Sequence, residues 1–320
     1  MIDLHMNERA WALAEQCIAR ADELRLAVHT LASGTRVIDA GIEAPGGLGA
    51  GRALAALCMG GLGHVELTSL TIGGDSWAGL HVWTDHPPEC CMASQYAGWA
   101  IDPAGFFAMG SGPLRAKARV EKALFEKLGY AEAATRGVLV LEGRTQPTEE
   151  VAQWIAAKAG IAAASLVVAI APTASLAGGI QIAARVLETG LHKMDAIGFD
   201  VRRVVSAAGS APWPPIARSD VRAIGRTNDC ILYGGQARYV VLADDDELAA
   251  IAERLPASAS SDYGTPFYDI FKRYDNDFYK IDPMLFSPAE VWLTSAASGR
   301  TFHAGGTDAG VLRRSLMGEG

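Results

Sequence analysis

"AGIAAASLVVAIAPTASLAGG", residues 159–179, is the most apolar run of the 320-residue chain. Alanine dominates it, and it holds three serine or threonine residues and Pro172, so it predicts a buried strand and a turn better than a membrane span. Apolar residues at helical spacing then predict a helix from about Ser175 to Leu191, with Gly190 near its C-terminal end.

The stretches on either side of this run predict helices and strands in mixed order. Helical spacing marks residues 7–32, 111–130 and 147–160, with Gly129 ending the second of these helices and Thr148 capping the third. Strands are expected at 33–44, 63–74, 78–88 and 137–143. Because no regular βαβ alternation is present, we expect an α+β fold, made of two mixed α/β domains with a ligand pocket between them.

Two clusters of proline and glycine suggest where the chain crosses between these domains. They lie at 85–89 ("DHPPE") and 206–220 ("SAAGSAPWPPIARSD"). The first domain is therefore expected to hold residues 1–88 and 216–320, and the second residues 89–215.

Composition restricts the possible partners and the compartment. The net charge of −8, with 36 acidic and 28 basic residues and no basic block, makes nucleic acid an unsuitable partner. The N-terminal residues have no signal-peptide pattern, and the five scattered cysteines are typical of reduced core thiols. We expect a cytoplasmic protein with no membrane association.

One polar stripe follows the predicted helix at 175–191. Gln181, Arg185, Glu188 and His192 fall at i, i+4, i+7 and i+11 on a helix that is otherwise apolar. The stripe is either a surface ion pair or the wall of a cleft. In a cleft, burial and the negative end of the helix would raise the pKa of Glu188 and Arg185 would lower it, which suits a general base.

Two glycine-rich stretches precede helices. In the first, at 44–67, the third glycine of a dinucleotide-binding loop is replaced, so tight turns and close helix packing are favoured. In the second, "AMGSGPLRAKAR" at 108–119, Ser111 lies between two glycines, with Pro113 at the first helical position and Arg115 in the first turn. The second stretch predicts an anion site, with a plain helix start as the alternative.

Two further clusters favour structure over chemistry. His81, His86, Cys90 and Cys91 lack zinc-site spacing, so no metal is expected. Residues 263–286 hold eight of the seventeen tyrosine and phenylalanine residues, and they form either a satellite core, which is favoured, or an aromatic wall for a flat ring.

Several segments taken together identify a family. The sequence resembles methenyltetrahydromethanopterin cyclohydrolases from about residue 40 to 316, in the stretches "GGLGAGRALAALCMGGLGHVEL", "CCMASQYAGWAI", "FFAMGSGPLRA", "APTASLAGGIQIAARVLETGLHK", "TNDCILYGGQ" and "YGTPFYDIFKRYDNDFYKIDPMLFSPAEV". The resemblance implies a cytoplasmic enzyme with no cofactor, a two-domain α+β fold and a homo-oligomer, most often a trimer. It also implies a pterin substrate, whose N5,N10-methenyl group is reversibly hydrolysed to the N5-formyl form.

The resemblance places the key arginine and glutamate at Arg185 and Glu188. Ser94 and Gln95, together with Ser111 and Arg115, are expected to line the substrate pocket. Two other functions remain open: an NAD(P)-dependent dehydrogenase acting on the same carrier, and a noncatalytic protein that binds the pterin carrier.

Overall fold

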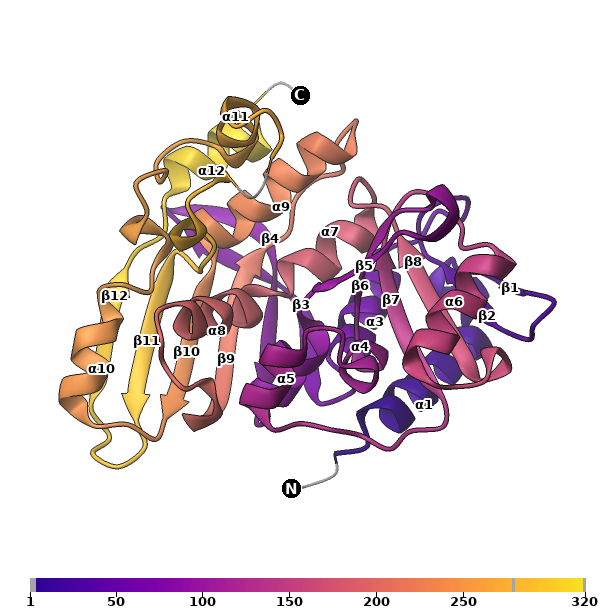
Figure 1. Cartoon of the computed structure of the whole chain (residues 1–320). Helices are drawn as coiled ribbons and strands as arrows, with labels where there is room; N and C mark the ends of the chain where they lie inside the picture. Colours follow the sequence, from indigo (N-terminus) through magenta and orange to yellow (C-terminus); the bar gives the residue numbers. More distant parts are fainter. Residues whose placement is uncertain (1–3, 278–279, 319–320) are drawn as a thin grey trace. The chain divides into compact units, whose positions relative to one another are not determined.

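The computed structural model describes residues 4–277 and 280–318. The chain forms two compact units, which are considered separately (Figure 1). Unit 1 comprises Met1–Gly63 and Glu89–Gln181, and unit 2 comprises His64–Pro88 and Ile182–Gly320. Each unit contains one six-stranded mixed sheet with helices packed on it, so the expected mixed architecture is confirmed.

Unit 1 is built on a sheet with the strand order β1-β2-β8-β7-β6-β5. Its strands are β1 (Ala27–Thr30), β2 (Arg36–Asp39), β5 (Trp99–Ile101), β6 (Ala108–Ser111), β7 (Gly137–Glu142) and β8 (Leu166–Ala171). The central strands β2, β8 and β7 are parallel, and the strands on either side are antiparallel. Its helices are α1 (Met6–Ala19), α2 (Ala21–Leu24), α3 (Leu48–Cys58), the π-helix η1 (Pro88–Gln95), η2 (Pro103–Gly105), α4 (Pro113–Ala118), α5 (Lys122–Leu128), α6 (Glu149–Ala159), η3 (Ala163–Ser165) and α7 (Leu176–Ala183).

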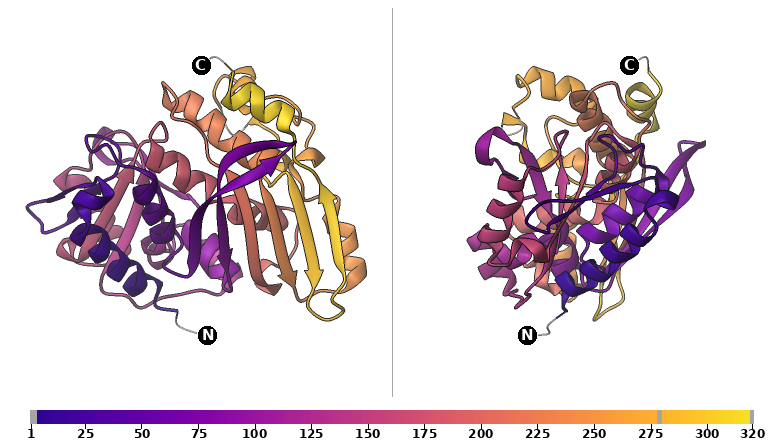
Figure 2. Two further views of the ribbon diagram at one scale, coloured as in Figure 1. Left: turned by 180° about the vertical axis from the view of Figure 1, so that it is seen from behind. Right: turned by 90° about the vertical axis from the view of Figure 1, so that its right-hand side faces the viewer.

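Both faces of this sheet are buried, as the apolar run at 159–179 predicts. Val167 and Ala169 of β8 face a core shared with α1 and α3, whereas Val168 and Ile170 face a core shared with α6. The N-terminal helices, drawn in indigo, cover the near face in the left view of Figure 2. Side chains of successive residues point to opposite faces of a strand, so a central strand covered on both sides must be apolar throughout. Among the described residues, no helix is long and apolar enough to span a membrane.

Unit 2 contains the sheet β12-β11-β10-β9-β4-β3. Its strands are β3 (Gly63–Ile72), β4 (Asp75–Thr84), β9 (Val204–Pro212), β10 (Gln236–Val241), β11 (Glu290–Ser295) and β12 (Thr301–Gly305). Only β10 and β11 pair in parallel among the registers that are described. Its helices are α8 (Val186–Ala196), η4 (Val201–Arg203), α9 (Asp220–Gly234), α10 (Asp245–Ala252), η5 (Ala257–Ala259), α11 (Phe267–Arg273), η7 (Pro283–Leu285) and α12 (Ala309–Leu316).

The division of the chain differs from the expected one. The predicted crossing at 85–89 coincides with the passage between units at Pro88, but the one at 206–220 is wrong. Residues 204–212 form β9, which pairs with β4 and β10 inside unit 2. Residues 36–39 form β2, which pairs with β8, so the N-terminal segment belongs with residues 89–181 rather than with the C-terminal part.

Three predicted helices are interrupted in the structure. The helix expected at 7–32 divides at Arg20 into α1 and α2, and Ala27–Thr30 form the strand β1, so the helical prediction is wrong there. The helix expected at 111–130 divides into α4 and α5, because Arg119 adopts a left-handed conformation with φ of 51°. Pro113 begins α4 and Gly129 ends α5, as predicted. Thr148 caps α6 by accepting a hydrogen bond from the amide of Val151 at 3.4 Å, which confirms that helix start.

Candidate active site

The helix expected at 175–191 is also two helices, and the interruption falls beside Arg185. α7 ends at Ala183 and α8 begins at Val186. The amide of Arg185 donates to the carbonyl of Ile182 at 2.9 Å, and the carbonyl of Arg185 accepts from the amide of Thr189 at 2.9 Å. Arg185 is therefore the N-cap residue of α8, and Glu188 lies in the first turn.

This position reverses one expected electrostatic effect. We expected the negative end of a helix to act on Glu188, with Gly190 close to the helix end, but α8 continues to Ala196. Glu188 instead lies at the N-terminal end, where unpaired backbone N–H groups favour negative charge. The helix therefore favours the ionised carboxylate, which is the form that a base needs before it accepts a proton.

Arg185 and Glu188 are both removed from solvent. Arg185 is 7% exposed and Glu188 is 5% exposed, so the alternative of a surface ion pair is wrong. Val186 and Leu187, between them, are fully buried. Charged side chains are rarely buried to this extent without partners or a function. Gln181 belongs to α7 in unit 1, so the predicted four-residue stripe does not lie on one continuous helix.

Three long-range hydrogen bonds, one from Tyr239 and two from Lys193, hold α8 in place within unit 2. Tyr239 on β10 donates its hydroxyl to the carbonyl of Leu187 at 2.9 Å. Lys193, 1% exposed, donates from Nζ to the carbonyl of Pro256 at 2.7 Å and to that of Met284. Burial lowers the pKa of Lys193 to about 8, and the charge of Asp282 opposes this shift. These contacts fix the helix that carries Glu188, and no local sequence pattern revealed them.

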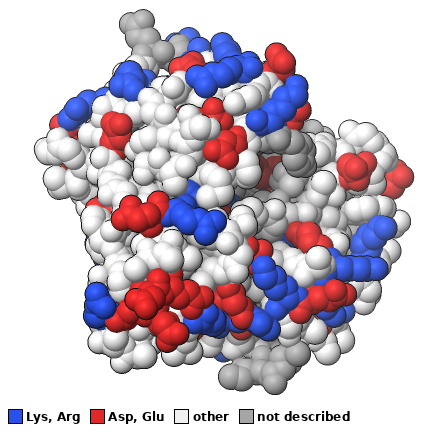
Figure 3. Space-filling model, turned by 60° about the vertical axis from the view of Figure 1, so that its left-hand side comes forward, with Lys and Arg blue, Asp and Glu red and all other residues white. Residues whose placement is uncertain are grey.

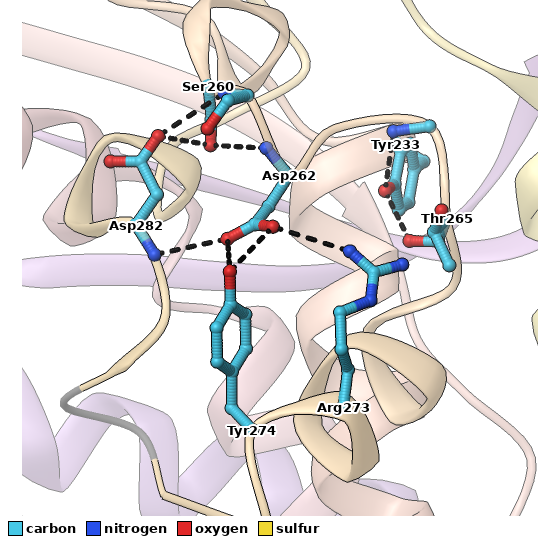
Figure 4. Close-up of polar contacts among 9 residues, drawn as sticks. Tyr233, Ser260, Asp262, Thr265, Arg273, Tyr274 and Asp282 are labelled. Atoms are coloured by element: carbon cyan, nitrogen blue, oxygen red, sulfur yellow. Dashed lines mark hydrogen bonds and ion pairs between the residues drawn. The ribbon is translucent and has the colours of Figure 1, made fainter.

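The aromatic segment supplies one of these anchoring carbonyls. Phe267, Phe271 and Leu285 are buried in a cluster with α9 and α12, so the described part of the segment forms the expected satellite core. Phe278 and Tyr279 lie outside the described residues. Figure 4 shows the polar contacts that hold this part of the chain together.

Asp262 is central to these contacts. Its carboxylate accepts from the hydroxyl of Tyr274 at 3.2 and 3.3 Å and from the amide of Asp282 at 3.2 Å (Figure 4). Arg273 lies 3.5 Å from the same carboxylate. Asp282 in turn accepts from the hydroxyl of Ser260 at 2.7 Å. The network fixes the loop around Met284, and thereby the carbonyl that receives Lys193.

A second group of predicted residues meets in unit 1. Ser94 donates its hydroxyl to the carbonyl of Cys58 at 2.6 Å, and the Cys58 thiol lies 3.3 Å from the hydroxyl of Ser111. The same thiol lies 3.7 Å from Oε1 of Gln181. All four side chains are buried. The structure thus brings Ser94, Ser111 and Gln181 together around the C-terminal end of α3. Gln95 is also fully buried, at the last position of η1.

Arg115 has a different environment from the one predicted. Its guanidinium donates to the carbonyls of Tyr96 at 2.8 Å, Ala93 at 3.1 Å and Met92 at 2.7 Å, and the side chain is 0% exposed. Glu121 lies 3.5 Å away. These acceptors belong to the C-terminal part of η1 and the residue after it, so Arg115 stabilises the backbone that presents Ser94 and Gln95. We therefore do not place it among the substrate contacts.

The anion site predicted at 108–119 does not form, because its expected donors are bonded to backbone carbonyls. The amide of Gly112 donates to the carbonyl of Ser94 at 2.7 Å, and the cation of Arg115 is directed at carbonyls. The first glycine stretch packs closely, as favoured: a Cβ added to Gly51 of α3 would lie 2.6 Å from Cβ of Ile180 on α7. Within residues 4–277 and 280–318, no three His, Cys, Asp or Glu side chains are grouped as metal ligands.

Comparison with known proteins identifies the family. A family model described as "Cyclohydrolase (MCH)" matches residues 5–316. The chain belongs to this cyclohydrolase family. A relative from Methylobacillus flagellatus, named methenyltetrahydromethanopterin cyclohydrolase, is 47% identical over 312 residues, which cover 97% of this chain and 95% of the relative. Relatives with the same name from Methanosarcina barkeri and Methanocaldococcus jannaschii are 39% and 40% identical, with 98% of both chains covered in each case.

The cyclohydrolase family assignment applies to both units. The matched residues 5–316 include α8 with Arg185 and Glu188, and also the cluster around Ser94 and Ser111. The resemblance found in the sequence is therefore confirmed.

Proposed function

We propose that this protein catalyses the reversible hydrolysis of 5,10-methenyltetrahydromethanopterin to 5-formyltetrahydromethanopterin. The observation that carries the proposal is the burial of Arg185 and Glu188 at the N-terminal end of α8, in a chain of the cyclohydrolase family. Full-length relatives named for this reaction support the choice of substrate.

The chemistry requires a positioned and deprotonated water molecule. The methenyl bridge is an amidinium-like cation, so its carbon is already electrophilic. Glu188 accepts one proton as the water oxygen forms its bond to this carbon, and then returns that proton to the departing nitrogen as the carbon–nitrogen bond breaks. The second proton of the water leaves to solvent, and the added oxygen becomes the formyl oxygen.

Arg185 is assigned to orient Glu188 and to set its affinity for the proton. It precedes Glu188 by three positions, and its backbone begins the helix whose first turn carries the glutamate. A guanidinium keeps its charge at all physiological pH values, so it can favour the ionised carboxylate without itself exchanging protons. Ser94, Gln95 and Ser111 are proposed to line the pterin pocket, with Arg115 supporting them from behind.

The proposed reaction uses no cofactor and no metal. Neither carbon nor nitrogen changes oxidation state in the hydrolysis, so a nicotinamide has no role. The glycine stretch at Gly51 packs against Ile180, and no observation favours a dehydrogenase over the hydrolase. We also propose, from the family resemblance, that the active protein is a homo-oligomer.

A direct experiment is to mix purified protein with the methenyl substrate and to follow the absorbance of the methenyl chromophore. The proposal predicts a loss of absorbance proportional to enzyme concentration, which neither EDTA nor the omission of NAD(P) prevents. Saturable binding without loss of the chromophore would instead identify a carrier-binding protein.

A further inference from the structure

Unit 2 contains a pocket whose lining includes none of the residues proposed for the reaction. Its volume is about 360 Å³, which lies within the range of small-molecule sites. It is lined by Arg222 and Arg226 of α9, Arg314 and Ser315 of α12, Pro266, Tyr268 and Asp269 at the start of α11, and Gly318. In Figure 3, basic side chains gather at the upper end of the molecule, where these helices lie.

Positive charge is in excess among the side chains that line the pocket. Three arginines and one carboxylate, that of Asp269, line it, so its formal charge is +2 in a chain whose net charge is −8. Within the described residues, none of the three arginines forms an ion pair with a carboxylate. In the part of the chain that the structure describes, the hydrogen bonds of Arg226 are two long ones to backbone carbonyls, of 3.3 and 3.5 Å. Arg314 has one of 3.5 Å.

Holding these cations together costs free energy. Arg222 and Arg226 are four residues apart on α9, where like charges repel across one helical turn. Burial lowers the pKa of Arg226, and the charge of Arg222 lowers it further. A bound anion would remove both penalties, because it would neutralise the pair and replace the lost solvation.

One arginine of the pocket stacks on an aromatic ring. The guanidinium of Arg222 lies over the ring of Tyr268, 4.7 Å from the ring centre, and Nζ of Lys272 lies 4.4 Å from the same centre. A hydrogen bond from Lys272 and the nearby arginine charge lower the pKa of Tyr268. Stacking restricts the guanidinium, so less conformational entropy is lost when it binds a ligand.

We propose that the pocket formed by Arg222, Arg226 and Arg314 binds a phosphate group. Three guanidinium groups from two helices present forked donors, which match the oxygens of a tetrahedral oxyanion. The volume exceeds that of a phosphate ion alone, so the pocket accommodates a phosphate monoester of a small molecule as well as free inorganic phosphate.

Titration calorimetry on the full chain tests this proposal. Inorganic phosphate is added to the protein at constant ionic strength, with sodium chloride as the reference, and glycerol phosphate is titrated in parallel. The test variants are Arg222→Gln/Arg226→Gln on α9 and Arg314→Gln on α12. The matched control is Arg300→Gln, which removes an exposed arginine of unit 2 that pairs with Asp245 at 3.0 Å instead.

We expect inorganic phosphate to bind saturably to the unmodified protein and to the control. Each test variant should bind phosphate at least about tenfold more weakly, because it lacks at least one charge-assisted hydrogen bond. Tighter binding of glycerol phosphate assigns the pocket to a phosphorylated small molecule, and equal or weaker binding assigns it to free phosphate. The proposal is overturned if phosphate shows no saturable binding below about 10 mM. Undiminished binding in both test variants, with circular dichroism unchanged, also overturns it.

Discussion

Replacing Asp229 with asparagine should change how the stability of unit 2 depends on pH. Asp229 lies in α9 and is 0% exposed. One oxygen accepts from the amide of Phe267 at 2.8 Å, and the other is hydrogen bonded to the hydroxyl of Ser315. Burial raises the pKa of Asp229 to about 7, and these two hydrogen bonds only partly oppose the shift.

The sign of the effect follows from proton binding. In the unfolded chain the carboxyl loses its proton near its ordinary pKa of 3.8, whereas in the folded protein it keeps the proton up to about pH 7. The folded state therefore binds more protons across this window, and stability falls as pH rises from about 4 to about 7. A shift of roughly three units, at about 1.4 kcal/mol each, gives a loss of at most about 4 kcal/mol.

Asparagine keeps both hydrogen bonds and cannot ionise. Its carbonyl accepts from Phe267, and its amide donates to Ser315. Asp229→Asn should therefore match the unmodified protein at about pH 4.5 and exceed its free energy of unfolding at pH 8 by up to about 4 kcal/mol. Urea unfolding, followed by tryptophan fluorescence from pH 4.5 to 8, measures the difference. Asp246→Asn, at an exposed position of α10, is the control. Parallel stability curves for Asp229→Asn and the unmodified protein would refute the reasoning.

Three further changes test how the candidate active site is supported. Gly190→Ala would place a Cβ 2.1 Å from the Tyr239 hydroxyl, so we expect α8 to shift. Initial rates should show turnover lower by at least about tenfold, and urea unfolding should show a free energy of unfolding lower by about 1–3 kcal/mol. Full activity would contradict the anchoring role of Tyr239. Lys193 has a pKa of about 8 in the folded protein and an ordinary value of 10.5, so the unfolded chain binds more protons between these pH values. The stability of the unmodified protein should therefore rise between about pH 8 and 10.5. Thermal unfolding of Lys193→Met should show no such rise. Arg115→Lys should lower the free energy of unfolding by about 2 kcal/mol, because the guanidinium of Arg115 donates to three backbone carbonyls. The KM of the folded fraction should stay the same. A large rise in KM without loss of stability would indicate that Arg115 contacts the substrate.

Local signals in the sequence predicted local structure well. Thr148, Pro113 and Gly129 mark helix ends because each acts on the backbone of its own turn. The uniformly apolar run at 166–171 marked a strand covered on both faces. The family resemblance, spread over segments from both units, indicated Arg185 and Glu188 as candidate site residues, and both are buried.

Features that depend on distant residues were not predictable in this way. Apolar periodicity continues through Ala183 and Ala184, so nothing in the pattern marks the end of α7 or the passage from unit 1 to unit 2. Arg115 has the residue type of an anion site, but its acceptors are carbonyls 19 to 23 positions earlier in the chain. The partners of Lys193 are 63 and 91 positions away. The hydrogen-bond partners of Arg115 and Lys193 come from chain segments that are in contact only in the folded protein.

The most direct test of the central claim is the turnover of Glu188→Gln, measured together with its affinity for the methenyl substrate. Glutamine preserves the shape of the side chain but cannot accept the proton from water. We predict that kcat falls by about 10²- to 10⁴-fold while the dissociation constant stays within about threefold. The control is Glu247→Gln, which breaks the surface ion pair with Arg203 and should keep full turnover. A Glu188→Gln protein that hydrolyses the methenyl substrate at a near-normal kcat would contradict the account.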